Sequence, residues 1–252
     1  DYAPGMQLSE ADFFVNSFCG SWYEPANKWG AGIGFADDVY IMAEEWNIQD
    51  MFDITDDEGN TLTSVGNTND TMGLASIVVD IANETAYTVP ALGQTGYEKL
   101  MPINPGHEDY VVVVTAGYNH GLEPAPLRIY VGVKGLGADG EPIAEDANER
   151  DQFLARNGLL YGQIYGLAIP NETFAELGID EIDTTSKMMD AYLTNAAAPN
   201  EFEAAFFPTS YRWGGWDAPV AVGNTEMTRW QLEEEQPEGY TFFVGDSKTE
   251  HP

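Results

Sequence analysis

The stretch DYVVVVTAG, residues 109–117, carries four consecutive valines at its centre. A strand with one face in water alternates apolar and polar side chains, because successive residues point to opposite faces. Residues 111–114 are apolar at every position and therefore fit a strand that is covered on both faces. This run predicts an inner strand of a sheet, with further strands on both sides of it.

Short β-branched and aromatic runs follow one another at regular spacing on both sides of this strand. Two pairs of arms surround turn residues, one pair around residues 57–60 and the other around Asn83-Glu84, and each pair is typical of a β-hairpin. The other predicted strands are DVYIMAEEW (38–46), LRIYVGVKG (127–135), GQIYGLAI (162–169) and YTFFVGD (240–246). This pattern favours an all-β propeller, barrel or sandwich formed by one domain over residues 1–252.

Helical patterns are few and short. NETFAELG (171–178) and TTSKMMDAYLTNA (184–196) have polar starts and helical spacing. Residues 195–219 have no clear periodicity, so residues 170–215 are predicted to form a loop and helical insertion in the domain. Residues 1–30 are aromatic and irregular, and WGAGIGF (29–35) is predicted to form a turn.

The charge of the chain excludes several classes of partner. Lys and Arg total 10 against 42 Asp and Glu, which gives a formal net charge of -32. Nucleic acid and anionic membrane surfaces would be repelled. No apolar run reaches the ~18–20 residues that cross a bilayer, so no membrane span is predicted. The acidic surface suits salty water, where screening removes self-repulsion, and carboxylates are also the ligands that Ca²⁺ prefers.

Few residues offer catalytic or metal-binding chemistry. The three histidines are scattered and no nucleophile motif of the Gly-x-Ser-x-Gly type occurs. The one cysteine, Cys19, excludes an internal disulfide and leaves a small buried hydrophobe, a free thiol or a metal ligand. Glu44 and Glu45 end an apolar strand, and Glu98 follows a glycine turn. Their pattern alone favours solvated carboxylates, although a charged group beside a buried run is costly unless it is paired or bound to metal.

Five segments share their order with a known family. These segments are FCGSW (18–22), GIGFADDVYIMAEEW (32–46), YTVPALGQTGYEKLMPI (87–103), LRIYVGVKG (127–135) and RNGLLYGQIYGLAI (156–169). Together they resemble the PhoX-type alkaline phosphatases and their secreted bacterial relatives, over about residues 19–169. The resemblance implies a β-propeller with metal ions near its axis and hydrolysis of small phosphate esters.

The same resemblance implies a set of metal ligands. Cys19 matches the family's iron-ligating cysteine, Glu98 matches a glutamate of the metal cluster, and Glu44 and Glu45 match its acidic pair. Carboxylate oxygens suit Ca²⁺ and a thiolate suits a softer metal such as iron. The resemblance also implies a secreted, periplasmic or cell-surface protein. A chain that begins with Asp1 is expected of a processed product whose signal has been removed.

Two departures from the family pattern leave alternatives open. The segment TAGYNHG (115–121) stands where the family carries an acidic pair. The arginines that a phosphate could use are Arg128, Arg156, Arg212 and Arg229, and each is expected to form a structural ion pair instead. The alternatives are a non-catalytic Ca²⁺-binding propeller with an eroded metal site, and a surface, filament or homo-oligomer subunit. At ~40–50 residues per blade the chain makes five or six blades at most, so an incomplete ring is expected.

Overall fold

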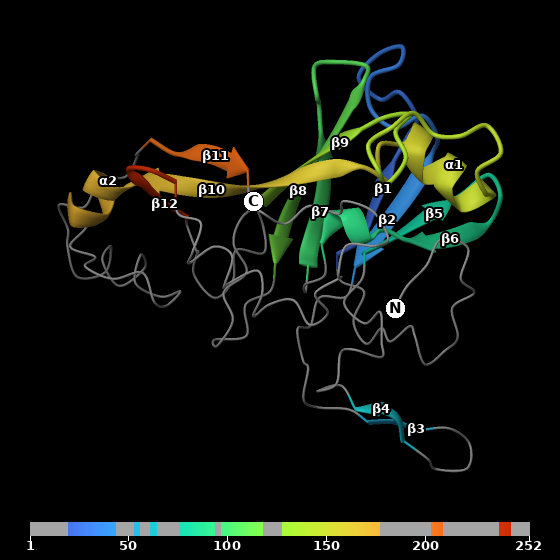
Figure 1. Ribbon diagram of the computed structural model, residues 1–252, viewed down its shortest axis with the longest axis horizontal. Coiled ribbons are helices and arrows are strands. Elements are labelled where there is room, and N and C mark those ends of the chain that lie inside the picture. Colours follow the sequence, from blue (N-terminus) through green and yellow to red (C-terminus); the bar gives the residue numbers. More distant parts are fainter. Residues whose placement is uncertain are drawn as a thin grey trace.

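The protein folds mainly as antiparallel sheets (Figure 1). The structure is a computed structural model, and it describes residues 20–43, 53–55, 61–64, 76–93, 97–117, 128–176, 203–208 and 237–242. A four-stranded sheet has the order β1(Trp22–Glu24), β2(Val39–Ala43), β5(Ser76–Asp80), β6(Thr85–Thr88). A separate hairpin pairs β3(Asp53–Thr55) with β4(Thr61–Ser64). The all-β prediction is therefore confirmed at the level of fold class.

The six-stranded sheet is a meander along the second half of the described chain. Its order is β11(Ala205–Pro208), β10(Gly162–Pro170), β9(Arg128–Val133), β8(Tyr110–Gly117), β7(Tyr97–Ile103), and β12(Tyr240–Phe242) also pairs with β10. The long strand β10 runs out beyond its neighbours and carries β11 and β12 on its far end (Figure 1). The rings of Phe207 and Tyr240 lie 4.9 Å apart, which joins these two short strands by an aromatic contact.

Strand β8 has the inner position that its valines predict. It pairs with β7 on one side and with β9 on the other. Val111 and Val113 are buried, whereas Val112 and Val114 on the opposite face are half-buried. The valine run is therefore explained by one face in the core and a second face that is partly covered.

Both sheets contribute to one hydrophobic core. Strand β2 alternates buried and half-buried residues, so that Val39, Ile41 and Ala43 face inward. The same core includes residues of the 3₁₀ helix η2(Pro90–Leu92) and of helix α1(Glu149–Arg156). Asn148 caps the N-terminus of helix α1, because its side chain accepts a hydrogen bond from the Asp151 amide. Strand β7 lies beside β1 and β2, which brings the two sheets together.

Three glycines surround the buried Tyr130 ring. A Cβ atom at Gly162 would collide with the ring, and a Cβ atom at Gly132 would lie 2.7 Å from its Cε1 atom. The Tyr130 hydroxyl donates a hydrogen bond of 2.9 Å to the carbonyl oxygen of Gly158. Gly158 has φ +66°, a conformation that glycine adopts without strain. The backbone at Gly132 and Gly162 therefore packs directly against the Tyr130 ring, and these two positions have no room for a side chain.

Two buried tyrosines predict a loss of stability at alkaline pH. Burial raises the pKa of Tyr130 above its ordinary value of 10.0, and it also raises that of Tyr97, where nearby Arg128 opposes the shift. The fold holds the neutral phenol, so this stabilisation is complete below pH 10 and is lost as the pH rises above it. Each tyrosine should lower the free energy of unfolding by up to ~1.4 kcal/mol per pH unit in that range.

Urea unfolding between about pH 9 and pH 11 measures this slope, and the variant Tyr130→Phe isolates one contribution. Phenylalanine keeps the ring and has no group to ionise, so the variant should lose stability with pH less steeply than the unchanged chain. An equal slope in the two proteins would show that Tyr130 does not contribute to alkaline unfolding.

The structure corrects several expectations from the sequence. Strand β1 lies in the region expected to be irregular, and β11 lies in the segment expected to be a loop. Strand β7 and helix α1 were not predicted, and α1 precedes residue 170, where helices were expected to begin. Helix α2(Asn171–Glu176) is confirmed, whereas the helix predicted over residues 184–196 lies outside the described residues.

The described ranges form two open sheets and the separate β3–β4 hairpin, and no closed barrel or ring. The propeller expected from the family resemblance thus remains a prediction, and the coarser all-β assignment is what the sheets establish. In the part of the chain that the structure describes, no helix combines the length and hydropathy needed to cross a membrane.

Candidate functional site

Glu98 is the one predicted metal ligand among the described residues, and it lies at a β-bulge. Tyr97 pairs with Gly117 and Lys99 pairs with Ala116, so the register shifts and Glu98 is the extra residue between them. Its side chain is 14% exposed, and its Oε1 atom lies 3.9 Å from the Lys99 ammonium. The expectation of a solvated turn residue is therefore wrong, because Glu98 belongs to strand β7 and is largely covered. Bulges redirect side chains and are frequent beside functional sites.

Gly20 lies directly against the backbone at this bulge. A Cβ atom at Gly20 would lie 2.6 Å from the carbonyl oxygen of Tyr97 and 2.9 Å from that of Glu98. Real Cβ atoms do not approach backbone atoms so closely, so the contact requires glycine. The residue that follows Cys19 in the chain is thus packed on the strand that carries Glu98.

The strand pairing also concerns Ala43, the described residue before Glu44. Strands β1 and β2 are antiparallel, with Trp22 opposite Ile41, so the start of β1 and the end of β2 lie at one end of the pair. Strand β2 ends at Ala43, the residue before Glu44, and both strands lie beside β7. The described chain positions that border Cys19 and Glu44 therefore converge on the strand of Glu98.

Cys19, Glu44 and Glu45 themselves lie outside the described residues. Within the described ranges, no three His, Cys, Asp or Glu side chains are grouped so that they could hold a metal ion. Three of the four predicted ligands are not in that search, so the ligand set stays a prediction that rests on the chain positions next to it.

Arg128 is a buried charge that the sequence did not identify as such. It is the first residue of β9, it is 2% exposed, and its Nε and Nη2 atoms have no hydrogen-bond partner. It forms no ion pair with any described residue, so the expected structural ion pair stays a prediction. Arg156 does pair as expected, with its Nε atom 2.6 Å from Asp37, while Arg212 and Arg229 lie outside the described residues.

The sheet register explains why Arg128 is buried. Leu100 of β7, Thr115 of β8 and Arg128 of β9 are successive partners across the sheet, so their side chains share the core face. The guanidinium carbon lies 5.4 Å from the centre of the Tyr97 ring. Tyr97 is held in turn by η2, because its hydroxyl donates a 2.7 Å hydrogen bond to the Leu92 carbonyl oxygen.

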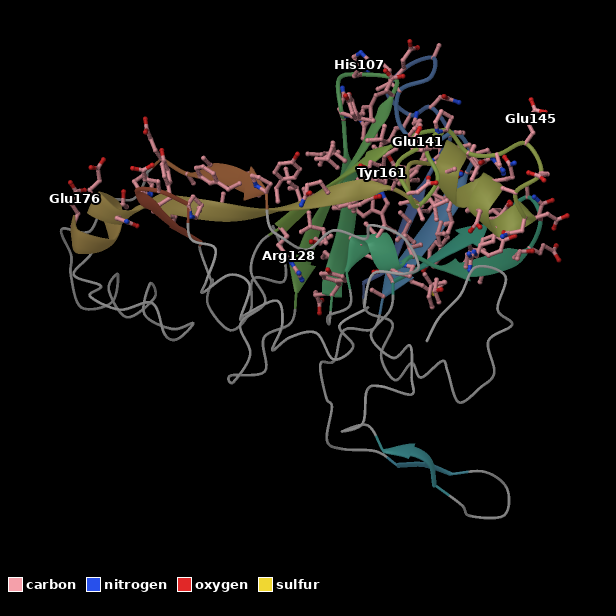
Figure 2. The ribbon with its side chains drawn as sticks, in the orientation of Figure 1. His107, Arg128, Glu141, Glu145, Tyr161 and Glu176 are labelled. Carbon is pink, nitrogen blue, oxygen red and sulfur yellow. The ribbon has the colours of Figure 1, made fainter. Side chains whose placement is uncertain are left out.

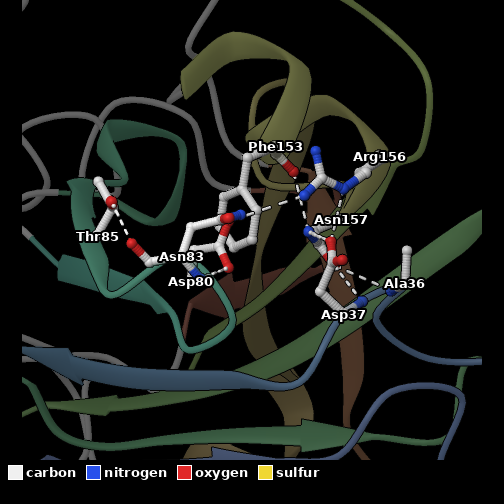
Figure 3. Close-up of polar contacts among 8 residues, drawn as sticks. All are labelled: Ala36, Asp37, Asp80, Asn83, Thr85, Phe153, Arg156 and Asn157. Atoms are coloured by element: carbon white, nitrogen blue, oxygen red, sulfur yellow. Dashed lines mark hydrogen bonds and ion pairs between the residues drawn. The ribbon is translucent and has the colours of Figure 1, made fainter. Parts of the chain in front are cut away.

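A separate polar network holds the end of α1 against the four-stranded sheet (Figure 3). The Asn157 side chain accepts hydrogen bonds from the amides of Ala36 and Asp37 at 2.9 and 3.2 Å. It also donates to the Asp37 carboxylate and to the Phe153 carbonyl oxygen, at 2.7 and 2.9 Å. The Asp37 carboxylate thus accepts hydrogen bonds from both Asn157 and Arg156. These groups stabilise the loop and are not candidates for catalysis or ligand binding.

The comparisons with known proteins add no assignment. No protein-family model, curated protein sequence or solved structure matches this chain. The functional argument therefore depends on the residues of the chain and on their positions.

Proposed function

We propose that this protein is a secreted, metal-dependent phosphoesterase of the PhoX type. The observation that carries the proposal is the contact of Gly20 with the β-bulge at Glu98. The family resemblance assigns metal ligation to residues on both sides of this contact. A close approach that only glycine permits holds the neighbour of Cys19 against the strand of Glu98.

The donor atoms of the proposed site match the implied metals. Cys19, Glu44, Glu45 and Glu98 would supply one thiolate and three carboxylates. Hard carboxylate oxygens suit Ca²⁺, and a thiolate together with carboxylates suits iron. When bound, such ions polarise a phosphate ester and stabilise charge on its oxygens. The protein's part is to hold the donors, and the buried edge of β7 gives Glu98 a fixed position for this purpose.

The two sheets support the propeller as part of this proposal. Strands β1, β2, β5 and β6 are paired in chain order, and β7 to β11 form a second meander in chain order. A propeller blade is a four-stranded antiparallel sheet. The first sheet has four strands, and β7 to β10 are four consecutive strands of the six-stranded sheet. We place these sheets as two neighbouring blades of an incomplete ring.

One observation favours a second candidate, a non-catalytic Ca²⁺-binding protein with an eroded site. The segment TAGYNHG (115–121), which begins in strand β8, contains no carboxylate, and Gly117 and Tyr118 stand near the positions of the family's acidic pair. The family resemblance expects acidic residues directly after this strand. A site without these acidic residues could still bind Ca²⁺ but would not hydrolyse phosphate esters.

Substitution of Glu98 tests the proposed ligand set. Glu98→Gln removes the charge and keeps the shape, so we expect metal affinity to fall by about tenfold or more, as losses at metal centres do. Elemental analysis of the purified proteins measures iron and calcium per chain. Glu145→Gln is the matched control, because Glu145 is exposed on the loop before α1 (Figure 2), and it should bind as the unchanged chain does.

Equal metal content in Glu98→Gln and in the unchanged chain would show that Glu98 is not a metal ligand. Hydrolysis of a generic phosphomonoester then separates the two candidates. Metal binding with hydrolysis supports the phosphoesterase, and metal binding without hydrolysis supports the eroded site.

A further inference from the structure

The Arg128 side chain has two buried hydrogen-bond donors without an acceptor among the described residues. Its side chain is 2% exposed, and Nε and Nη2 are buried without a hydrogen-bond partner. A buried charge is costly unless an opposite charge or hydrogen bonds compensate it. A buried arginine with two open donors therefore points to a partner that is not among the described residues.

The two open donors form one edge of the guanidinium. The hydrogens on Nε and Nη2 point in the same direction, side by side, and this edge matches two oxygens of one carboxylate or phosphate group. The opposite edge is enclosed by the fold. A Cβ atom at Gly93 would lie 3.9 Å from Nη1 and 2.7 Å from the Tyr97 hydroxyl, so a glycine is required beside it.

The other described arginines have carboxylate partners within the chain. Arg150 lies 2.6 Å from Asp151 and Arg156 lies 2.6 Å from Asp37. Arg128 differs, because it has no such partner among the acidic residues that the structure describes. Its position is at the end of the six-stranded sheet opposite His107, which lies on the tip of the β7–β8 hairpin (Figure 2).

We propose that the Nε–Nη2 edge of Arg128 binds an oxyanion group of a small molecule, a carboxylate or a phosphate. One group is held by two parallel N–H···O hydrogen bonds, and the Tyr97 ring supports the guanidinium from the side. Enclosure strengthens both hydrogen bonds, because the surroundings screen charge less than water does. This binding needs no metal ion and thus goes beyond the proposed phosphoesterase site.

The test is calorimetric titration of the full chain in the presence of a chelator. Inorganic phosphate and acetate are the two probes, and they distinguish a phosphate group from a carboxylate group. We expect saturable binding of one of them at one ion per chain. Arg128→Lys keeps the charge but loses the paired donors, so its affinity should fall at least tenfold. Arg156→Lys is the matched control, because the Arg156 guanidinium is already paired with Asp37. The affinity of this variant for the probe should be unchanged.

A second measurement covers the case in which Arg128→Lys fails to fold. In the unchanged chain, the NMR signal of one arginine Nε–H group should shift as the bound probe is added. That shift supports the proposal, and the absence of a shift together with no heat of binding from either probe would overturn it. Equal affinity in Arg128→Lys and in the unchanged chain would also overturn it. Since chelator is present throughout, failure here leaves the metal-site test with Glu98→Gln unaffected.

Discussion

Replacing Gly132 with alanine is expected to lower the free energy of unfolding by ~3 kcal/mol or more, at the upper end of what overpacking a core costs. The added Cβ atom would overlap the carbonyl oxygen of Gly158 and lie 2.7 Å from the Tyr130 ring. The obstacle on one side is backbone, and on the other it is a fully buried ring. Neither can give way cheaply, because Gly158 follows α1 and Tyr130 lies in the centre of β9.

Gly137→Ala is the matched control for this substitution. There the nearest atom to an added Cβ is a side-chain oxygen of Asp139 at 3.1 Å, and that side chain can turn aside. Its effect should stay within about 1 kcal/mol, as is usual where no core packing changes. Urea unfolding measures both variants. If Gly132→Ala were as stable as Gly137→Ala, the packing of β9 against the Gly158 turn would be incorrect.

Asn157→Ala is the second substitution with a large expected effect. Asn157 is fully buried and its amide group makes four hydrogen bonds, two as acceptor and two as donor. Its removal leaves the amides of Ala36 and Asp37 and the Phe153 carbonyl oxygen without this partner. The hydrogen bond to Phe153 is buried and the other three are partly buried. At roughly 0.5–1.5 kcal/mol for each hydrogen bond lost, the expected loss of stability is about 3 kcal/mol.

Asn104→Ala provides the comparison for Asn157→Ala. Asn104 is exposed and its side chain accepts one hydrogen bond, 2.9 Å from the Gly106 amide. Water can replace that partner, so the loss should be below about 1 kcal/mol. Thermal unfolding of the two variants checks the difference. Similar melting temperatures for both would mean that the Asn157 network does not fix the end of α1.

Strands with a clear period could be predicted from the sequence, and irregular strands could not. The β8 valines and the alternating residues of β2 identify buried faces directly. Strand β7 gives no such signal, because it contains a bulge at Glu98 and a proline at Pro102. Both are features of an edge strand, where one side needs no partner. Helix α1 was missed because it is short and depends on the Asn148 cap and on packing of Phe153.

The candidate site also has one part that the sequence predicts and one part that only the strand pairing reveals. The family resemblance selects Glu98 by its place in a motif, but the bulge and the contact with Gly20 arise from pairing between distant strands. Arg128 follows the proline-containing segment GLEPAPL (121–127) at the start of a strand, and the sequence predicts only an ion-paired arginine there. Only the register across β7, β8 and β9 turns it to the core face.

The central claim is that this chain holds metal ions with Cys19, Glu44, Glu45 and Glu98 and uses them on phosphate esters. Elemental analysis of the gently purified, unchanged protein tests it most directly, combined with a phosphomonoester assay on the same sample. The account predicts iron and calcium at stoichiometric levels together with hydrolysis. A protein that contains neither metal and releases no phosphate would contradict it.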